Sequence, residues 1–383
     1  MSSMITALDK FRNKPRKVAI VHDFLVAYGG AERVLQSLAA LYPEAPIYTL
    51  LADVKLVEER FPGREIRTSW LGKLPRFIQK RYRLFLPFFP AAIESLDLRE
   101  FDLVISSSGA WSKGIITRLN TTHIAYLHSP MRYAWDYHEA YLAELGARGR
   151  RSIFTRLLLS YLRIWDKQAA ERPDILLANS EFTRERIQKY YRREARVVYP
   201  GALTISEQSG APGSLTEKRS SFLVVSRLTK SKKIDIVIDA FNKLALPLVV
   251  VGGGPETERL RKQAGKSIRF AGFVTDAQLV EYYRGARAVL FPSEEDFGMV
   301  AVEALSFGTP VIGLEYGGLR EIVTPGVTGE FFHVAAPEII AEAVRRFLEH
   351  EGHYDTTVMR ESVQKFSNDN FQKQFSEVIS NSR

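Results

Sequence analysis

Short apolar runs alternate with amphipathic segments along most of this chain of 383 residues. The first run, KVAIVHDF at 17–24, precedes a pair of glycines and AERVLQSLAALYP, in which apolar residues recur at helical spacing. The order of strand, polar turn and helix returns at 175–192 and 222–244 and continues through the second half. Such alternation predicts an α/β fold with parallel sheets covered by helices on both faces.

A polar stretch without periodicity, 204–221, interrupts this alternation near the middle of the chain. A chain of 383 residues is also too long for one ordinary hydrophobic core. We therefore predict two domains, at 1–203 and 222–365. The stretch 204–221 is the predicted linker, and a last helix is predicted at 366–383.

The composition narrows the class of protein. A formal net charge of +9 indicates an anionic partner, but charge alone does not choose among nucleic acid, a phosphorylated ligand and an acidic membrane. The chain has no cysteine, which excludes disulfides, thiolate metal sites and a cysteine nucleophile, and this suits a reducing cytoplasm. The basic N-terminus lacks the apolar core of a secretory signal, and no apolar run approaches the length of a membrane span. We expect a cytoplasmic protein.

The segment 71–98 combines cations with aromatic rings and has no acidic residue before Glu94. Such a surface suits an interfacial membrane segment, because the rings insert among the lipids while the cations meet lipid phosphates. An ordinary helix with a solvated basic face is the alternative. A second basic stretch at 148–172 is a candidate extension. The predicted membrane-facing residues are Lys73, Arg76, Phe77, Lys80, Arg81, Arg83, Phe85, Phe88 and Phe89.

Two glutamates, Glu295 and Glu303, mark the turn from a strand-like run to a helix-like run within 291–318. Such turns place ligands at the carboxyl edge of a parallel sheet, and the unpaired N–H groups of the following helix can hold an anion. The pair therefore predicts a ligand site. The general acid and base of a hydrolase is a competing interpretation of the same two residues.

Two further turns carry groups that suit a diphosphate. Arg227 and Lys232 surround the turn after the strand-like run FLVV, where a guanidinium and an ammonium can neutralise phosphate together. Gly29 and Gly30 allow backbone N–H groups to approach a phosphate closely, although glycine also suits a plain turn.

Two other features are weaker. The run Gly252–Pro255 lacks the later glycine of the dinucleotide-binding motif, so it gives little support to NAD binding. His128 ends a predicted strand at the edge that carries the loops, where an imidazole can bond a sugar hydroxyl. Taken alone, His128 is better interpreted as a satisfied edge histidine.

The ordered set SRLTKSKKIDIVIDAF, GFV, PSEEDFGMVAVEALSFGTPVIG and GGLREIV resembles the motifs of retaining glycosyltransferases of family 4. The resemblance implies the GT-B fold, in which two Rossmann-like domains with parallel sheets face each other across a cleft and the last helix crosses back to the first domain. HDFLVAYGGAERV and YLHSPMRYAWDYHEAYL are similar to bacterial mannosyltransferases that use GDP-mannose to build O-antigen and exopolysaccharide.

The resemblance also implies roles for single residues. It assigns Arg227 and Lys232 to the donor diphosphate, Glu295 to the transferred sugar and Glu303 to the ribose. His128 matches a histidine near the sugar, so the implied catalytic residues are His128, Arg227, Lys232 and Glu295. The implied donor-binding residues are Gly29, Gly30, Arg227, Lys232, Gly254, Val274, Glu295, Phe297, Gly298, Met299, Val300 and Glu303.

Two positions depart from the pattern of the family. Asp296 stands where the family often has glycine, which adds a second acid beside Glu295. Lys233 follows Lys232 where the family often has Lys-Gly, which adds positive charge beside the expected phosphate site.

The implied reaction moves a hexose, with retention, from GDP-mannose or another nucleotide diphosphate sugar to a lipid-linked saccharide acceptor. It would serve surface polysaccharide synthesis, lipopolysaccharide included, at the anionic cytoplasmic face of the inner membrane. We predict no metal and no cofactor, because neither a clustered His/Asp set nor an Asp-x-Asp pair occurs. The alternatives are a UDP-hexose or another GDP-sugar as donor, and a catalytically silent GT-B partner in an assembly complex. Nucleic acid is not an expected partner, because no RNA- or DNA-binding motif accompanies the charge.

Overall fold

A computed structural model of the chain describes residues 16–79, 81–144, 150–202 and 219–382, which form two compact units. Unit 1 comprises Met1–Asn179, Arg184–Val197 and Ile379–Arg383, and unit 2 comprises Ser180–Thr183 and Val198–Val378. Most of the predicted linker at 204–221 lies outside the described residues, so the linker stays a prediction.

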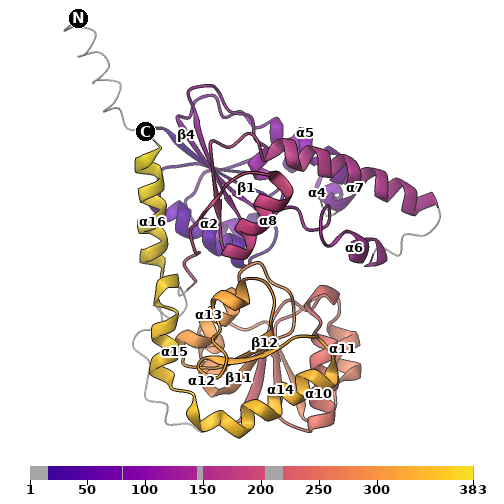
Figure 1. Ribbon diagram of the computed structural model, residues 1–383. Coiled ribbons are helices and arrows are strands. Elements are labelled where there is room, and N and C mark those ends of the chain that lie inside the picture. The colour runs from indigo at the N-terminus through magenta and orange to yellow at the C-terminus, as the bar shows by residue number, and fades with distance from the viewer. Residues whose placement is uncertain (1–15, 80, 145–149, 203–218, 383) are drawn as a thin grey trace, which may run out of the picture. The chain divides into compact units, whose positions relative to one another are not determined.

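Unit 1 is built on a seven-stranded parallel sheet in the order β3-β2-β1-β4-β5-β6-β7 (Figure 1). The register pairs His22 with Ser107 and Ser108 with Leu127, so the carboxyl ends of β1, β4 and β5 share one edge. The strands are β1 (Val18–His22), β2 (Ile47–Thr49), β3 (Ile66–Thr68), β4 (Leu103–Ser108), β5 (Thr122–Leu127), β6 (Ile175–Ala178) and β7 (Arg196–Val197).

Helices cover both faces of this sheet, with α5 and α7 on one side of the strands and α2 on the other (Figure 1). Ala19 and Val21 of β1 pack in one core cluster with Ile93 of α5 and Leu162 of α7. The α-helices are α2 (Gly30–Leu41), α3 (Val54–Arg60), α4 (Arg76–Gln79), α5 (Phe89–Glu94), α6 (His138–Glu144), α7 (Arg150–Ala169) and α8 (Glu181–Tyr191), whose first residues belong to unit 2.

Unit 2 is built on a six-stranded sheet in the order β10-β9-β8-β11-β12-β13, and every pair of neighbouring strands is parallel. Successive residues of β8, Phe222 and Leu223, enter different core clusters, as the period of two in a strand requires. The strands are β8 (Ser221–Val225), β9 (Leu248–Val251), β10 (Ile268–Gly272), β11 (Ala286–Phe291), β12 (Val311–Leu314) and β13 (Gly329–Phe332).

The two faces of this second sheet are covered by different helices. Residues of α12, α13 and α15 pack with Leu223, whereas residues of α10 and α14 pack with Phe222. The α-helices are α10 (Ile234–Leu244), α11 (Thr257–Gln263), α12 (Asp276–Gly285), α13 (Met299–Ser306), α14 (Pro337–His350), α15 (Thr356–Ser362) and α16 (Asn368–Asn381), whose last residues belong to unit 1.

The aromatic and basic segment 71–98 is divided into short helices. It contains η1 (Trp70–Lys73, a 3-10 helix), α4, η2 (Tyr82–Phe88, also 3-10) and α5. Proline lacks a backbone N–H, and Pro75, Pro87 and Pro90 stand before α4, inside η2 and at the start of α5. The prolines therefore explain why no single long amphipathic helix forms here.

One predicted membrane residue is buried. Phe89 is 2% exposed, and its ring centroid lies 5.4 Å from that of Phe24 and 5.1 Å from that of Trp111. This burial contradicts the membrane assignment of Phe89, because an apolar residue that begins α5 serves the core here. Phe77 and Phe88 are 71% and 54% exposed, and Phe85 is partly buried. Lys80 and the side chain of Arg83 lie outside the described residues.

Candidate functional site

The loops that carry the predicted donor-binding residues meet where the strand order of unit 2 reverses. That reversal lies between β8 and β11, which are hydrogen-bonded neighbours. In parallel α/β sheets, the loops after the carboxyl ends of such strands diverge and leave a crevice for ligands. Arg227 and Lys232 follow β8, and Glu295 follows β11, so all three come to this switch point.

The structure pairs two of the predicted catalytic residues with each other. The Lys232 ammonium donates to Oε1 of Glu295, and the Ser293 hydroxyl donates to the same oxygen at 2.9 Å. The two charged side chains are about one-fifth to one-quarter exposed, at 21% for Lys232 and 25% for Glu295. Glu295 is thus held in place while its other carboxylate oxygen stays available to a ligand hydroxyl.

The loop after β8 also carries cations that form no ion pair within the part of the chain that the structure describes. Arg227 is exposed, and neither it nor Lys230 forms an ion pair with any residue that the structure describes. Lys233 pairs instead with Glu294 at 3.3 Å. Unpaired cations at a loop edge attract anions, and the planar guanidinium of Arg227 suits the two oxygens of a phosphate.

Lys233 adopts a backbone conformation that explains why its position favours glycine. Its φ of 52° and ψ of 33° place it in the left-handed region between η4 (Lys230–Lys232) and α10. A residue with a Cβ pays roughly 1–2 kcal/mol in that region. In this conformation the Lys233 ammonium forms its ion pair with Glu294.

The start of α13 offers unpaired backbone donors beside Glu295. Gly298 precedes the helix with φ 113°, which only glycine adopts readily. The N–H groups of Phe297, Gly298, Met299 and Val300 have no hydrogen-bond partner in the described part of the chain. Four such N–H groups at a helix start can hold a phosphate, and the donor-binding role of these four residues stays a prediction.

The glycine pair after β12 holds the Glu295 loop close. The Gly318 N–H donates to the backbone oxygen of Glu295 at 3.1 Å. A Cβ on Gly317 would lie 2.1 Å from that oxygen, and a Cβ on Gly318 would lie 2.5 Å from the oxygen of Asp296. The two glycines therefore pack against the backbone of the Glu295 loop, and a side chain at either position would displace that loop.

Glu303 is buried, whereas a ribose-binding carboxylate must reach the ligand. The residue is 1% exposed, and the Tyr283 hydroxyl donates to its Oε2 at 2.7 Å. A ribose role for Glu303 stays a prediction. Tyr283 is a partner that the sequence pattern does not reveal, because it lies on α12 and not in a motif.

The three glycines after β9 are explained by packing against the loop after β8. A Cβ on Gly252 would lie 2.0 Å from the oxygen of Ser226, and a Cβ on Gly254 would lie 2.4 Å from that of Leu228. Phe273 covers Gly253 and is 85% exposed at the same edge. The neighbouring Val274 packs partly into the core of unit 2. The donor-binding roles of Gly254 and Val274 stay predictions.

In unit 1, polar side chains gather at the carboxyl ends of β1, β4 and β5. The Ser107 hydroxyl lies 3.1 Å from Nδ1 of His22 and 2.8 Å from Nε2 of His128. Nε2 of His22 lies 3.4 Å from Oε1 of Glu32, in the first turn of α2. His128 is therefore a satisfied edge histidine that belongs to a hydrogen-bonded chain, and its catalytic role stays a prediction.

Gly29 directly precedes α2 and has extended φ and ψ, which any residue adopts. A Cβ on Gly29 would meet only Oε2 of Glu32, at 3.4 Å. The fold of unit 1 thus does not require glycine at this position. The predicted donor contacts of Gly29 and Gly30 stay predictions.

Asp23 anchors the loop after β4. Its carboxylate accepts four backbone hydrogen bonds at 2.7–3.1 Å from the N–H groups of the consecutive residues 109–112. Four charge-assisted bonds to a buried carboxylate fix this loop beside Ser107. The sequence signal was the polar pair His22-Asp23 at the end of an apolar run.

Two histidines, the fully buried His123 and the partly buried His128, make the stability of unit 1 depend on pH. Burial lowers the pKa of His123 and of His128 from 6.5 to about 3, so both imidazoles are neutral in the folded chain. The unfolded chain takes up a proton on each histidine below about pH 6.5, whereas the folded chain does so only near pH 3. The folded state therefore has its full stability above pH 6.5 and loses stability as the pH falls toward 3. At pH 5 the loss amounts to about 2 kcal/mol for the fully buried His123.

We expect His123→Gln to reduce the loss of stability between pH 7.5 and pH 5. His123 is fully buried, and Nε2 lies 2.8 Å from the Ser106 hydroxyl, a contact that glutamine can retain. Urea unfolding followed by tryptophan fluorescence reports on unit 1, because Trp70, Trp111, Trp135 and Trp165 are the chain's four tryptophans. An equal loss in the wild type and the variant would contradict this assignment.

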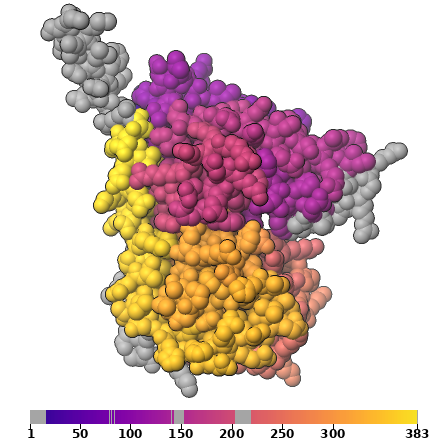
Figure 2. Space-filling view, viewed as in Figure 1, coloured from indigo at the N-terminus to yellow at the C-terminus, as the bar shows by residue number. Residues whose placement is uncertain are grey.

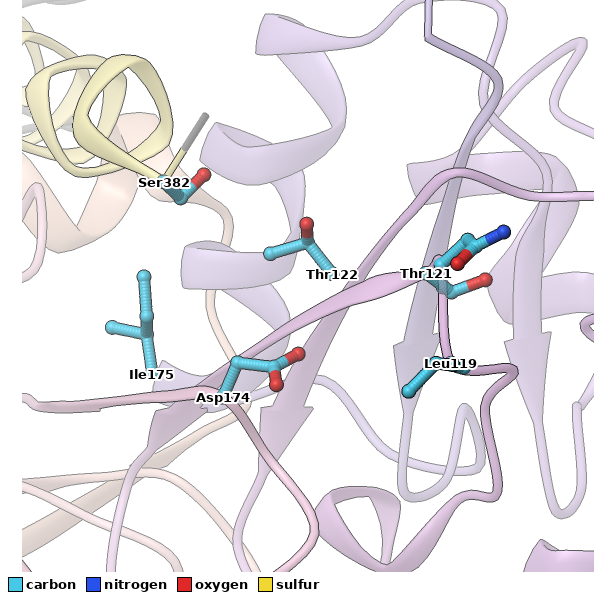
Figure 3. A pocket seen from close by; sticks show the side chains of 7 residues that line it. Leu119, Thr121, Thr122, Asp174, Ile175 and Ser382 are labelled. Atoms are coloured by element: carbon cyan, nitrogen blue, oxygen red, sulfur yellow. The ribbon is translucent and has the colours of Figure 1, made fainter.

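A pocket of about 320 Å³ lies at the other edge of the first sheet. It is lined by Thr122 and Ile175, the first residues of β5 and β6, together with Asp174, Leu119 and Ser382 (Figure 3). The Asp174 carboxylate accepts the backbone N–H of His123. This pocket therefore lies away from the carboxyl ends that carry the predicted residues.

Neither a metal site nor a membrane-spanning helix is present among the described residues. No group of three or more His, Cys, Asp or Glu side chains within them is placed to hold a metal ion. No helix among them combines the length and the apolar character that crossing a membrane requires.

Two family models match the two halves of the chain. Residues 28–203 match the model described as Glycosyltransferase Family 4, and residues 207–367 match the model described as Glycosyl transferases group 1. The chain belongs to the glycosyltransferases of these families. The family part of the resemblance is thereby confirmed, whereas the narrower mannosyltransferase part is not.

The curated relatives match only part of the chain. An uncharacterized glycosyltransferase of Methanocaldococcus jannaschii is 35% identical over 165 residues, which is 40% of this chain and 42% of that protein. The D-inositol 3-phosphate glycosyltransferase of Mycolicibacterium smegmatis is 32% identical over 190 residues, or 43% of each chain. The chain thus spans less than half the length of these relatives.

Solved structures share the fold over nearly the whole chain. Sucrose-phosphate synthase from Thermosynechococcus elongatus has a TM-score of 0.71 at 20% identity, covering 96% of this chain and 99% of that one. Anabaena HepE in complex with UDP and glucose has a TM-score of 0.67 at 20% identity, covering 96% and 100%. At identities this low the similarity shows the fold alone. The shared fold confirms the predicted α/β GT-B class.

Proposed function

We propose that the chain transfers a hexose, with retention, from a nucleotide diphosphate sugar to a saccharide acceptor, and that GDP-mannose is the donor. The observation that carries this proposal is the edge of unit 2 at β8 and β11. There, the exposed Arg227, the Lys232–Glu295 pair and the free N–H groups at 297–300 occupy neighbouring loops. Cations and N–H donors suit a diphosphate, and a positioned carboxylate suits sugar hydroxyls.

In the proposed reaction, the bond between the anomeric carbon and the diphosphate oxygen breaks while the acceptor oxygen bonds to the same face of that carbon. The acceptor proton passes to the departing phosphate oxygen. Arg227 and the N–H groups at the start of α13 stabilise the negative charge that develops on the diphosphate. Each such donor contributes roughly 3–4 kcal/mol in a transition state. Lys232 shares its charge between Glu295 and the phosphate.

A UDP-hexose is the second candidate donor. It is supported by the fold that the chain shares with Anabaena HepE, which was solved in complex with UDP and glucose. Thermal unfolding in the presence of different nucleotides distinguishes the two candidate donors. A ligand present at 100 times its dissociation constant stabilises the folded state by about 2.7 kcal/mol. GDP is expected to raise the unfolding temperature more than UDP, and the opposite order would select the UDP-hexose.

We expect Phe273→Ala to weaken the binding of the nucleotide about tenfold, because stacking of a base on an aromatic ring is worth about 1–3 kcal/mol. Phe273 is 85% exposed beside Gly253, at the edge that carries Arg227. Val358→Ala is a matched control, since Val358 on α15 is also an exposed apolar residue of unit 2. Titration with GDP by calorimetry measures both, and an unchanged affinity of the Phe273 variant would exclude the stacking.

We also propose that unit 1 binds an anionic membrane surface, where a lipid-linked acceptor is found. Phe77, Leu84 and Phe88 are 54–74% exposed, and Lys73, Arg76 and Arg81 are exposed beside them in sequence. A second apolar row runs along α7, which extends at the outside of unit 1 (Figures 1 and 2). Its members, 48–72% exposed, are Ile153, Phe154, Leu157, Tyr161 and Ile164. Rings and cations together suit lipid headgroups.

Replacing Lys73, Arg76 and Arg81 by serine is expected to reduce binding to liposomes that contain anionic lipid. Each cation near such a surface is worth about 1 kcal/mol, so three removals weaken binding roughly a hundredfold. The control is the double change Lys262→Ser and Lys266→Ser, which removes exposed lysines of unit 2. Sedimentation with vesicles measures both. Equal binding of the triple variant and the control would rule out this surface.

A further inference from the structure

A chain of hydrogen bonds in unit 1 connects a carboxylate to the predicted sugar-side histidine. Oε1 of Glu32 lies 3.4 Å from Nε2 of His22, and Nδ1 of His22 lies 3.1 Å from the Ser107 hydroxyl. That hydroxyl lies 2.8 Å from Nε2 of His128. Ser107 is fully buried and His22 is 2% exposed, so water does not replace these contacts.

The fold brings these four residues together from separate elements. His22 ends β1, and the parallel register places Ser107 of β4 directly opposite. His128 follows β5, the neighbour of β4, and its own N–H donates to the oxygen of Ser108 at 2.8 Å. Glu32 enters from the first turn of α2, at the end of the helix where a negative charge is favoured.

Donor and acceptor chemistry gives this chain a direction. An ionised carboxylate only accepts, so Nε2 of His22 must carry the proton that faces Glu32. With one proton on the His22 ring, Nδ1 is then an acceptor and takes the single proton of Ser107, whereas a second proton on that ring would reverse the direction. The Ser107 oxygen is left to accept, so Nε2 of His128 must donate to it.

The last link decides what His128 can offer a ligand. Because burial keeps the His128 imidazole neutral, a proton on Nε2 leaves a lone pair on Nδ1. No described residue makes a hydrogen bond with that Nδ1. A free lone pair accepts from a hydroxyl but repels groups that only accept, such as a carboxylate.

We propose that Glu32 and His22 are positioning residues that hold His128 in the Nε2–H tautomer, so that Nδ1 accepts a hydrogen bond from a sugar hydroxyl. The second part rests on the proposed function, because it takes the ligand of His128 to be a sugar. A uronic acid differs from its hexose only at C6, where a carboxylate cannot donate. Where the contacted hydroxyl is the one on C6, this hydrogen-bonded chain therefore favours the neutral hexose over the uronic acid.

The tautomer can be measured without any activity. Protein labelled with ¹⁵N-histidine distinguishes a protonated from an unprotonated ring nitrogen, and His128→Gln identifies the signals of His128 among the seven histidines. We expect one tautomer in the wild type, with the proton on Nε2. In Glu32→Gln, the amide can donate to Nε2 of His22, which reverses the chain, and we expect Nδ1–H to appear on His128. A proton on Nδ1 of His128 in the wild type would overturn the proposal.

Two further variants separate positioning from loss of structure. Glu58→Gln removes an exposed acid on α3 and should leave the tautomer unchanged. Ser107→Ala interrupts the hydrogen-bonded chain. In a protein that carries Ser107→Ala, the additional change Glu32→Gln should therefore leave the tautomer of His128 unchanged. If Glu32→Gln changes the tautomer equally with and without Ser107, the effect does not pass through the chain and the proposal fails.

A kinetic measurement then tests the consequence. Glu32→Gln should lower kcat/KM for the hexose donor about tenfold, the value of one lost hydrogen bond, while the affinity of unit 2 for the free nucleotide stays the same. For a donor that carries a uronic acid, Glu32→Gln should lower kcat/KM less than it does for the hexose donor, or should raise it. If the wild type transfers no sugar but shows the predicted tautomer, the proposed function fails and the positioning stands. Equal losses for the two donors would exclude the selection of hydroxyl groups.

Discussion

Glu295→Ala is expected to lower the rate of sugar transfer by at least roughly 10²-fold while the chain stays folded. The change removes the carboxylate that binds both the Lys232 ammonium and the Ser293 hydroxyl. Lys232 is then free to turn away from the phosphate position, and the sugar loses an acceptor for its hydroxyl groups. The loss should appear in kcat and in kcat/KM alike, because the contact is needed in the transition state.

The neighbouring Glu294 provides a matched control. It is also a partly exposed glutamate in a lysine pair, with Lys233 at 3.3 Å. Glu294→Ala should keep a turnover close to that of the wild type. Arg227→Ala should resemble Glu295→Ala, since it removes the unpaired cation at the same edge. Turnover of the Glu295 variant at the level of the Glu294 variant would refute the donor site.

Asp166→Asn is expected to destabilise unit 1 by about 3–5 kcal/mol, because it leaves a buried ammonium without its counter-ion. Lys113 and Asp166 are both fully buried, and Nζ lies 2.5 Å from Oδ1. Trp135 Nε1 and the Tyr191 hydroxyl donate to Oδ2, each at 2.8 Å. An asparagine of the same size retains part of these bonds but cannot neutralise Lys113, so the loss reports mainly on charge.

Asp97→Asn is the control for this measurement. Asp97 pairs with Arg99 at 2.7 Å, but the two side chains are 61% and 80% exposed, so solvent screens the pair. We expect no measurable change in the urea midpoint. Tryptophan fluorescence follows unit 1 in both variants. Equal midpoints for the two variants would show that the buried pair does not stabilise the unit.

The fold was predictable from sequence because the apolar runs repeat with a clear period. Phe222 and Leu223 point to opposite faces, and both faces of the sheet are covered by helices. The segment 71–98 was harder to predict, because its prolines divide it and Phe89 belongs to the core. Composition identifies an aromatic and basic segment, but it does not tell which rings are buried.

The candidate site was predictable where its chemistry lies in consecutive residues after a strand. Arg227, Lys232 and Glu295 were found this way, and the structure brings them to one edge. Their pairing was not predictable, because the Lys232–Glu295 contact joins residues 63 positions apart. The hydrogen bond between Tyr283 and Glu303 was not predictable either, because it also joins residues that are distant in sequence.

The residues around His128 show the same limit. His22 and Ser107 are separated by 85 positions in sequence but face each other in the parallel register. The polar ends of β1 and β4 were visible in the sequence as isolated signals. Their combination into one chain depends on the strand order, which the pattern of apolar residues does not specify.

The most direct test of the central claim is the transfer reaction itself. The purified chain is incubated with GDP-mannose and a lipid-linked acceptor extract, in parallel with UDP-hexoses, and the products are followed by mass spectrometry and by NMR of the anomeric proton. We predict a product that is heavier by one hexose, with GDP-mannose as the donor and with the anomeric configuration retained. No gain of a hexose from any nucleotide sugar, with an acceptor that a known transferase elongates in the same extract, would contradict the account.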